Sequence, residues 1–280
     1  MTLSASEPIS VALYSLLLRV RPNQLAEFLK KLLRVQRRCL PIATGHLFWT
    51  DPASVFGLHL LGNRVYEQGM TRLLQSLLRP ADTFVDIGGN EGYFSVLASS
   101  AVPFGVVHCI EPQSRLQEVI RKNVQLNSCS QVITHPVAIT DKDGTITLFL
   151  RPSTNTGASS LFRYWRLGSK TERVSCCTLD SFFEAAALKE VRLMKVDCEG
   201  AEHLVILGAR GVLRQRKIQF IAMEYHPTIC GTENCTAAHA QLLAAGYALA
   251  KLNGLCIYHV PGGEDELRSL GELQAHTDWM

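Results

Sequence analysis

The chain has 280 residues, of which 47% are hydrophobic and 19% charged, and its formal net charge is +3 at pH 7. A chain of this length and hydrophobicity buries a full core in one large domain, so two independent domains are not required. Its small net charge provides no basic tract concentrated enough to favour binding of a phosphate backbone, and we expect no nucleic-acid partner.

The nine cysteines predict reduced thiols in a cytoplasmic protein, because a chain this long and apolar does not need a disulfide scaffold. No convincing signal-peptide cleavage region is present, which also favours the cytoplasm. Cys230, Cys235 and His226 lie close in the sequence. Their loose spacing, without a second cysteine pair at zinc-finger spacing, does not favour structural zinc.

Residues 1–80 are expected to form a helical lead-in or cap to the main domain. Helical patterns alternate there with short strand-like patches, with strands expected at 45–49 and 55–59 and a helix near 66–78.

The first part of this lead-in is too short to cross a membrane. The apolar run Val11–Val20 has about ten residues, whereas a membrane-spanning helix needs about 20. An amphipathic and basic stretch follows between Leu25 and Arg38. We expect these helices to dock on the main domain or on a second subunit, which allows a homo-oligomer, with peripheral contact to an anionic membrane surface as the alternative.

The segment Phe84–Ser95 runs from a buried-strand pattern through a glycine turn into an apolar helical pattern. Gly88, Gly89 and Gly92 remove the Cβ atoms that would hold a ligand away from the backbone. This arrangement predicts a nucleotide-type cofactor that lies directly on the turn.

Val106–Glu111 is predicted to be the next buried strand, ending in an acid about 20 residues beyond the glycine turn, where a carboxylate can accept hydrogen bonds from both hydroxyls of an adenosine ribose. The glycine spacing differs from the Gly-x-Gly-x-x-Gly of dinucleotide sites, and no Gly-Lys-Ser/Thr of triphosphate sites is present. The sequence therefore favours an adenosine-containing cofactor and disfavours the pyrophosphate of NAD.

Alternating strand and helical patterns continue to residue 260 and predict a parallel sheet with helices on both faces. The strands are expected at 131–139, 145–150, 173–177, 191–197 and 219–224, and the helices at 114–126 and 201–208. Asn253-Gly254 predicts a tight hairpin between 246–252 and 255–260, which places an antiparallel pair at the end of the sheet.

The strands at 145–150 and 173–177 are expected to pair across an inserted loop that could face the substrate. The loop is small and polar around Asn155, and its aromatic residues are Phe162, Tyr164 and Trp165. Each aromatic side chain either contacts a ligand or anchors the loop, and anchoring is the expectation for any single one.

From about Phe48 to Val260 the chain resembles the FkbM family of S-adenosylmethionine-dependent methyltransferases. Phe84–Ser95 is similar to the family's cofactor turn, with Gly89 where alanine is usual. The other matching motifs are Asn155-Thr-Gly157, Thr178-Leu-Asp180 and the most specific one, Lys195-Val-Asp-Cys-Glu-Gly-Ala-Glu202.

The resemblance implies an α/β, Rossmann-like methyltransferase fold, with a mostly parallel seven-stranded sheet, a terminal antiparallel hairpin and an N-terminal helical extension. We expect the methyltransferase domain at 81–262 and a C-terminal tail at 263–280. S-adenosylmethionine is the implied cofactor, with its methionine end beside the glycine turn. The candidate cofactor-binding residues are Asp86, Gly88, Gly89, Asn90, Gly92, Tyr93, Glu111, Pro112 and Asp197.

Methyl transfer from a sulfonium to an alcohol is an in-line displacement, which requires a positioned acceptor and a destination for its proton. Carboxylates at strand ends are the natural candidates for both tasks. Asp197 and Glu199 are the first candidates for the base or the substrate-orienting pair. Glu224, with the neighbouring His226, is the second candidate. Asp197, Glu199 and His226 each have a structural alternative. Asp197 can position the cofactor, Glu199 can stabilise a helix N-terminus, and His226 can be a turn residue before Pro227.

Clustered acids could also hold a divalent cation that lowers the pKa of the acceptor hydroxyl, and the sequence leaves a metal and direct base catalysis both open. The resemblance implies O-methylation of a hydroxyl on a sugar, glycan or polyketide-like small molecule. The alternatives are N-methylation of a small molecule and a non-catalytic S-adenosylmethionine-binding module. An NAD-dependent oxidoreductase is disfavoured by the glycine spacing and the terminal hairpin.

Overall fold

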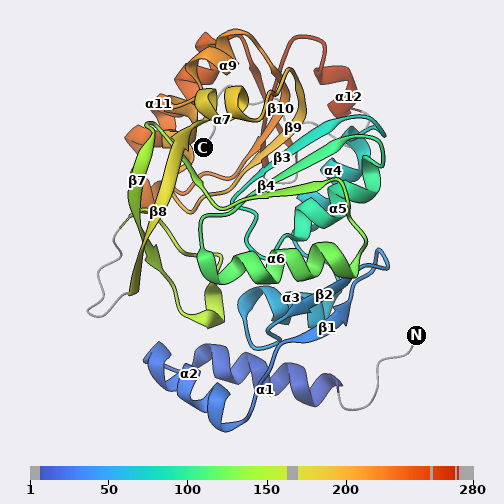
Figure 1. Ribbon diagram of the computed structural model, residues 1–280, viewed down its shortest axis with the longest axis vertical. Coiled ribbons are helices and arrows are strands. Elements are labelled where there is room, and N and C mark those ends of the chain that lie inside the picture. Colours follow the sequence, from blue (N-terminus) through green and yellow to red (C-terminus); the bar gives the residue numbers. More distant parts are fainter. Residues whose placement is uncertain (1–6, 163–169, 253–254, 269, 271–280) are drawn as a thin grey trace.

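A computed structural model describes residues 7–162, 170–252, 255–268 and 270. At its centre is a seven-stranded sheet with the strand order β11-β12-β10-β9-β3-β4-β5 (Figure 1). The strands are β3 (Thr83–Ile87), β4 (Val106–Ile110), β5 (Val132–His135), β9 (Val191–Val196), β10 (Ile218–Met223), β11 (Ala248–Leu252) and β12 (Leu255–His259).

The pairing of these strands confirms the expected sheet. All neighbours from β5 to β10 are parallel, whereas β12 is antiparallel to both β10 and β11. The turn Asn253-Gly254 that was expected to join β11 to β12 lies outside the described residues. The sheet is therefore that of a Rossmann-like methyltransferase fold, with an antiparallel hairpin at one edge.

Both faces of the sheet are buried. Successive side chains of a strand point to opposite faces, so neighbouring residues belong to different cores. In β3, Phe84 belongs to one hydrophobic core, and Val85 and Ile87 belong to the other. Helices α4 (Gln68–Leu77) and α5 (Tyr93–Ala101) contribute to the first core. The second core is covered by α7 (Leu179–Ala185), α8 (Glu202–Leu207), α9 (Arg210–Arg214) and α11 (Thr232–Ala244).

A second sheet of three strands flanks the first and has the order β6-β8-β7. It consists of β6 (Ala138–Thr140), β7 (Gly144–Leu150) and β8 (Lys170–Thr178), with the 3₁₀ helix η1 (Ser153–Asn155) after β7. The expected antiparallel pairing of 145–150 with 173–177 is confirmed. Of the aromatic residues in the intervening loop, Tyr164 and Trp165 lie outside the described residues.

One expected strand is wrong: residues 131–139 do not form a single strand but divide into β5 and β6, which belong to different sheets. Pro136 lies between them. Proline has no backbone N–H to donate to a strand ladder, so the chain leaves one sheet and enters the other there. Helix α6 (Ser114–Leu126) has the bounds expected from its pattern.

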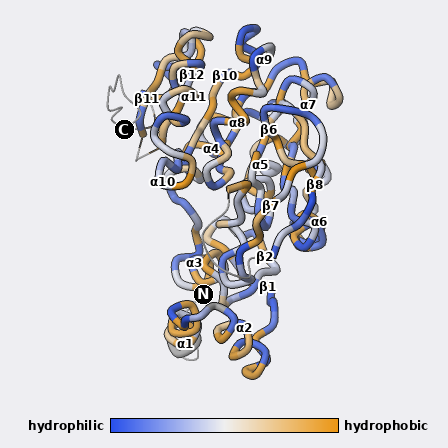
Figure 2. The backbone as a smooth tube through the Cα atoms, turned by 90° about the vertical axis from the view of Figure 1, so that its left-hand side faces the viewer, coloured by the Kyte–Doolittle hydropathy of each residue, from blue (hydrophilic) through white to orange (hydrophobic). Residues whose placement is uncertain are grey.

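The N-terminal part lies at one end of the molecule (Figures 1 and 2). It consists of α1 (Glu7–Arg19), α2 (Asn23–Leu32), β1 (Arg38–Pro41), β2 (Leu47–Thr50) and α3 (Val55–Asn63). Its strand β2 packs against α6. Phe48 of β2 and Phe56 of α3 share a core with Tyr93 of α5. In the part of the chain that the structure describes, no helix has the length and apolar character needed to cross a membrane.

The strand expected at 55–59 is wrong, because these residues begin helix α3. The hydroxyl of Ser54 accepts a hydrogen bond from the N–H of Gly57 at 2.9 Å and caps the helix. A short apolar run does not distinguish strand from helix, and the capping serine was the signal that separates them. The remaining helices are α10 (Pro227–Cys230) and α12 (Glu264–Arg268), and none of the nine cysteines forms a disulfide.

Candidate active site

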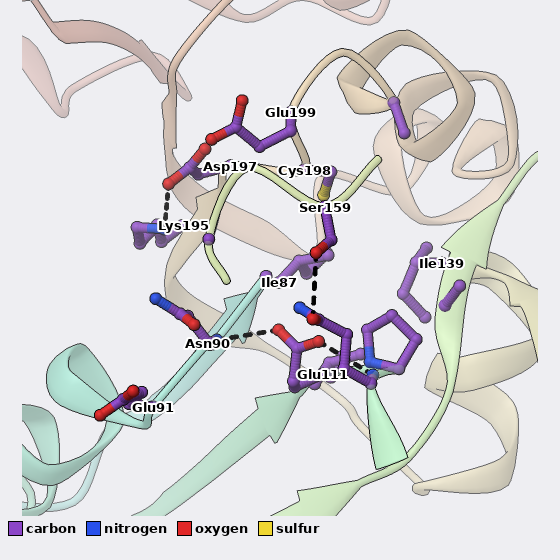
Figure 3. A pocket seen from close by; sticks show the side chains of 18 of the residues that line it. Ile87, Asn90, Glu91, Glu111, Ile139, Ser159, Lys195, Asp197, Cys198 and Glu199 are labelled. Atoms are coloured by element: carbon purple, nitrogen blue, oxygen red, sulfur yellow. Dashed lines mark hydrogen bonds and ion pairs between the residues drawn. The ribbon is translucent and has the colours of Figure 1, made fainter. Parts of the chain in front are cut away.

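A cavity of about 880 Å³, including the solvent at its mouth, lies at the C-terminal ends of three neighbouring strands (Figure 3). Gly88 follows β3, Glu111 follows β4 and Asp197 follows β9. Parallel strands end on the same edge of a sheet, so three segments far apart in the sequence meet there. Residues of the second sheet, such as Ile139 and Leu148, close the opposite side.

The glycine turn forms one wall because its backbone contacts two neighbouring loops directly. Gly88 has φ +83°, and a Cβ atom on it would lie 1.9 Å from the carbonyl oxygen of Asp197. The N–H groups of Gly88 and Gly89 both donate to the carbonyl of Ile110 at 3.0 Å. A Cβ on Gly89 would lie 2.6 Å from the sulfur of Cys109, which explains glycine where the related turn usually has alanine.

Two of the candidate cofactor residues stand behind the cavity wall instead of lining it. Asp86 is fully buried, and its Oδ2 accepts a hydrogen bond from the Ser95 hydroxyl at 2.7 Å. Gly92 has φ +82° and caps helix α5. Both shape the turn from within the fold. The other seven line the cavity: Gly88, Gly89, Asn90, Tyr93, Glu111, Pro112 and Asp197.

Glu111 is 4% exposed and is held by backbone amides on both carboxylate oxygens. Oε2 accepts from the N–H of Asn90 and Oε1 from the N–H of Gln113, each at 2.9 Å. Burial raises the pKa of Glu111 to about 7, although these two hydrogen bonds act in the opposite direction. A carboxylate oxygen has more than one lone pair, so each retains capacity for a further donor in the cavity.

The segment after η1 covers the glycine turn. The hydroxyl of Thr156 donates to Oδ1 of Asn90 at 3.0 Å, and its carbonyl accepts from the amide of Gln113 at 3.3 Å. Ser159 donates to Oε1 of Gln113 at 3.0 Å. This segment includes Thr156 and Gly157 of the motif Asn155-Thr-Gly157, so the structure brings that motif onto the glycine turn.

The other end of the cavity is acidic and is formed by Asp197 and Glu199 (Figure 3). Oδ2 of Asp197 pairs with Nζ of the buried Lys195 at 3.1 Å. Burial opposes a charge on Lys195, but Asp197 and neighbouring carboxylates outweigh it and raise the pKa of Lys195. Glu199 has φ +51°, and burial followed by the charge of Asp197 raises its pKa to about 7.

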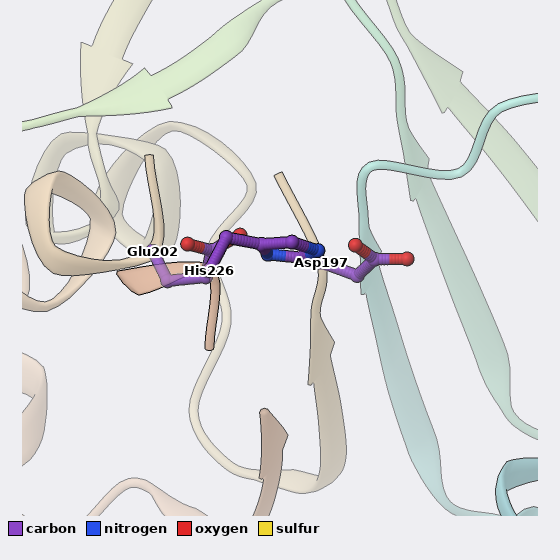
Figure 4. Close-up of side chains that lie close together, drawn as sticks. All are labelled: Asp197, Glu202 and His226. Atoms are coloured by element: carbon purple, nitrogen blue, oxygen red, sulfur yellow. The ribbon is translucent and has the colours of Figure 1, made fainter. Parts of the chain in front are cut away.

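Glu224 and His226 follow β10 and lie beside this acidic end without lining the cavity. Nδ1 of His226 lies 3.1 Å from Oε1 of Glu202, and Nε2 lies 3.8 Å from Glu199 and 3.9 Å from Glu224. Figure 4 shows the imidazole ring between Glu202 and Asp197. Burial opposes a charge on His226, but the hydrogen bond and charge of Glu202 raise its pKa to about 9.

Glu202 has a structural role, which is to hold the loop after β9. It is fully buried, and the same Oε1 also accepts from the N–H groups of Cys198 at 2.9 Å and Gly200 at 3.1 Å. These bonds hold the loop that carries Asp197 and Glu199. The helix N-terminal role that the sequence allows for Glu199 belongs to Glu202, which is the acid in the first turn of α8.

Glu67 belongs to the acidic end and was missed by the sequence analysis. It stands at the N-terminus of α4 with φ +41°, and one of its oxygens lies within 4.8 Å of ligand atoms of Asp197 and Glu224. Burial raises the pKa of Glu67 to about 7, while Lys195 acts against this. No sequence spacing links Glu67 to the strand ends. The one signal that the sequence offers for Glu67 is its charge at the start of a helix expected in the lead-in.

Among the residues that the structure describes, two overlapping sets have the spacing of a metal site. They are Asp197 with Glu202 and His226, and Asp197 with Glu67 and Glu224. The first set fits a cation poorly, because Oε1 of Glu202 already lies 3.1 Å from Nδ1 of His226 and accepts from the N–H groups of Cys198 and Gly200. Lys195 already pairs with Asp197, which both sets share. The chemistry proposed below therefore rests on these side chains without a metal.

The sheet order and the cavity at its strand ends define a Rossmann-like methyltransferase fold. The sequence model described as the methyltransferase FkbM domain matches residues 86–249, which is more than half of the chain. The chain therefore belongs to the FkbM methyltransferase domain family.

Similar proteins include "Methyltransferase 1" of Beauveria bassiana (strain ARSEF 2860), which is 29% identical over 148 residues. That match covers 46% of this chain and 59% of the relative, so it spans less than two thirds of the relative's length. Among solved structures, a putative rRNA-methylase from Clostridium thermocellum is 10% identical with a TM-score of 0.45, covering 70% of this chain and 98% of that chain. M. jannaschii TYW2 in complex with AdoMet is 13% identical with a TM-score of 0.40, covering 80% and 83%.

Proposed function

We propose that this protein transfers the methyl group of S-adenosylmethionine to a hydroxyl oxygen of a small molecule or a glycan. The observation that carries the proposal is one cavity with Glu111 and the glycine turn at one end and Asp197 and Glu199 at the other. The family and its described relative are both methyltransferases. None of the nine cysteines forms a disulfide, which supports a reducing compartment such as the cytoplasm.

In this proposal Glu111 binds the adenosine. Its two oxygens are fixed by the N–H groups of Asn90 and Gln113 and face the cavity, where the two ribose hydroxyls would donate to them. The methionine part of the cofactor would then lie beside the turn Gly88–Asn90. The backbone contact between Gly88 and Asp197 brings this part close to the acidic end.

The acidic end would position the acceptor and take its proton. As the bond from the acceptor oxygen to the methyl carbon forms and the bond from that carbon to sulfur breaks, the hydroxyl proton needs a destination. Glu199 has a pKa of about 7, which suits a proton acceptor near neutral pH. Asp197, fixed by Lys195, would orient the hydroxyl for in-line attack.

Calorimetric titration with S-adenosylmethionine, S-adenosylhomocysteine and NAD tests the cofactor. We expect both sulfur cofactors to bind and NAD not to bind, and the opposite result would contradict the proposal. A screen of hydroxylated and amine acceptors, followed by release of S-adenosylhomocysteine, tests the reaction. Turnover of amines alone would replace O-methylation by N-methylation, and cofactor binding without turnover of any acceptor would favour a binding module.

A further inference from the structure

Helices α1 and α2 concentrate the exposed apolar side chains of this protein. Within the described residues, six of the eleven exposed large hydrophobic side chains belong to the segment 13–33: Leu13, Leu16, Leu25, Phe28, Leu32 and Leu33. Scattered exposed apolar residues are ordinary, but a contiguous group marks a surface for interaction. We call this group the N-terminal apolar face.

The face is the outer side of helices whose inner side is already packed. On α2, Phe28 and Leu32 follow Leu25 by three and seven residues, so the three side chains lie along one stripe of the helix. Ala26 and Lys30 lie on the other side and are buried, with Lys30 paired to Asp51. The main domain therefore cannot cover the outer stripe while it holds the inner one.

The position of the two helices leaves this face open. α1 and α2 contact each other and form one end of the molecule, at the bottom of Figure 1 and Figure 2. On α1, Leu16 is 61% exposed, whereas its neighbour Leu17 is 4% exposed. The two helices thus present apolar side chains along one terminal surface.

Positive charge gathers at the same end. Residues 7–38 contain seven Lys or Arg and two Asp or Glu, a formal charge of +5, whereas the remainder of the sequence has a formal charge of −2. Lys30 is paired with Asp51 of the N-terminal part, and Arg37 is paired with Glu91 of the main domain. Arg19, Lys31 and Arg34 are exposed at the rim of the face and form no ion pair with any residue that the structure describes.

We propose that the N-terminal apolar face binds the surface of an anionic lipid bilayer. Apolar side chains at the headgroup boundary, with arginine and lysine at the rim, are the combination that holds an amphipathic helix in a membrane interface. Each basic side chain near an anionic leaflet adds attraction. A second copy of the chain fits less well, because a two-fold contact would bring the same basic rims together.

Such binding would act close to the cofactor cavity. Glu27 of α2 accepts a hydrogen bond from the N–H of Ser153 at 2.9 Å, and Lys30 donates to the Ser153 hydroxyl at 3.2 Å. Ser153 begins η1, and the chain continues from there to Thr156 on the glycine turn. The membrane-facing helix therefore holds the base of the segment that covers the cavity.

Sedimentation of the full-length protein with vesicles tests the proposal. We expect it to bind vesicles of phosphatidylcholine with phosphatidylserine at least about tenfold more tightly than vesicles of phosphatidylcholine alone, and more weakly at high salt. The double variants Phe28→Ser with Leu32→Ser, and Lys31→Glu with Arg34→Glu, should each reduce binding by about tenfold or more. Phe104→Ser and Lys189→Glu, exposed elsewhere on the surface, are the matched controls and should bind like wild type.

The melting temperature of every variant is measured in parallel, because substitutions at exposed positions should leave the fold intact. Wild-type protein that does not bind anionic vesicles would overturn the proposal. So would double variants that bind like wild type. A dimer seen by sedimentation equilibrium, lost in Phe28→Ser with Leu32→Ser and accompanied by no vesicle binding, would assign the face to a second copy instead.

Discussion

The imidazole Nδ1 of His226 lies 3.1 Å from Oε1 of the fully buried Glu202. This contact joins the end of β10 to the loop after β9, because Glu202 also receives the N–H groups of Cys198 and Gly200. A protonated His226 is therefore part of the support for the loop that carries Asp197 and Glu199.

His226→Gln should destabilise the protein at pH 6 much more than at pH 9.5. The pKa of His226 is raised to about 9, so its stabilising contribution is complete below the ordinary value near 6.5 and is lost as the pH rises through 9. Allowing for solvent screening, we expect a loss of about 2 kcal/mol at pH 6. Denaturant unfolding at both pH values measures this, and an equal loss at both would contradict it.

Glu111→Ala should weaken S-adenosylmethionine binding by about 1–3 kcal/mol, because the ribose hydroxyls would lose their acceptors. Calorimetry on a preparation with native circular dichroism measures the change. Glu118→Ala, on the exposed side of α6, is the control and should bind the cofactor like wild type. Unchanged affinity in a folded Glu111→Ala protein would remove the ribose assignment.

Asp197→Asn should reduce turnover by about 10²-fold or more while cofactor affinity is largely retained, because the charge acts on the acceptor in the transition state. The substitution keeps the shape of the side chain. Donor affinity, melting temperature and methyl transfer are compared on one preparation, with the exposed Asp141→Asn as the control. Near-normal turnover would refute the catalytic role, and lost stability with normal turnover per folded molecule would make Asp197 structural.

Turnover should rise with pH through about 7, because a proton acceptor is active only in its deprotonated form and the pKa of Glu199 is about 7. Glu199→Gln should remove most of the activity and flatten this rise. The pH profile of kcat/KM measures both effects. If the rise persists in Glu199→Gln, another group titrates, and Glu67, whose pKa is also about 7, becomes the candidate.

Gly88→Ala should destabilise the fold by about 3 kcal/mol or more, because the added Cβ meets the Asp197 carbonyl and the residue has positive φ. Gly62→Ala is the matched control. A Cβ on Gly62, in helix α3, meets no atom within 4 Å, so this change should stabilise the protein by up to about 1 kcal/mol. Thermal unfolding distinguishes them, and equal melting temperatures would show that the turn tolerates a side chain.

Local sequence patterns are enough to predict most of the sheet, the glycine turn and the acids at the strand ends. These follow from local rules: apolar periodicity marks a buried strand, glycine permits the positive φ seen at Gly88, and parallel strands bring their C-terminal ends to one edge. Glu111 and Asp197 could be placed in one crevice for that reason.

Which other side chains join Glu111 and Asp197 depends on how distant segments pack together. Glu67 reaches Asp197 from a lead-in helix, and Glu202 was revealed as the partner of His226 by the folding of two loops. Helix α3 replaced an expected strand because a serine cap and core packing decided between patterns that are too short to differ. Contacts between segments distant in the chain depend on how the elements pack, and periodicity within one segment carries no information about its partners.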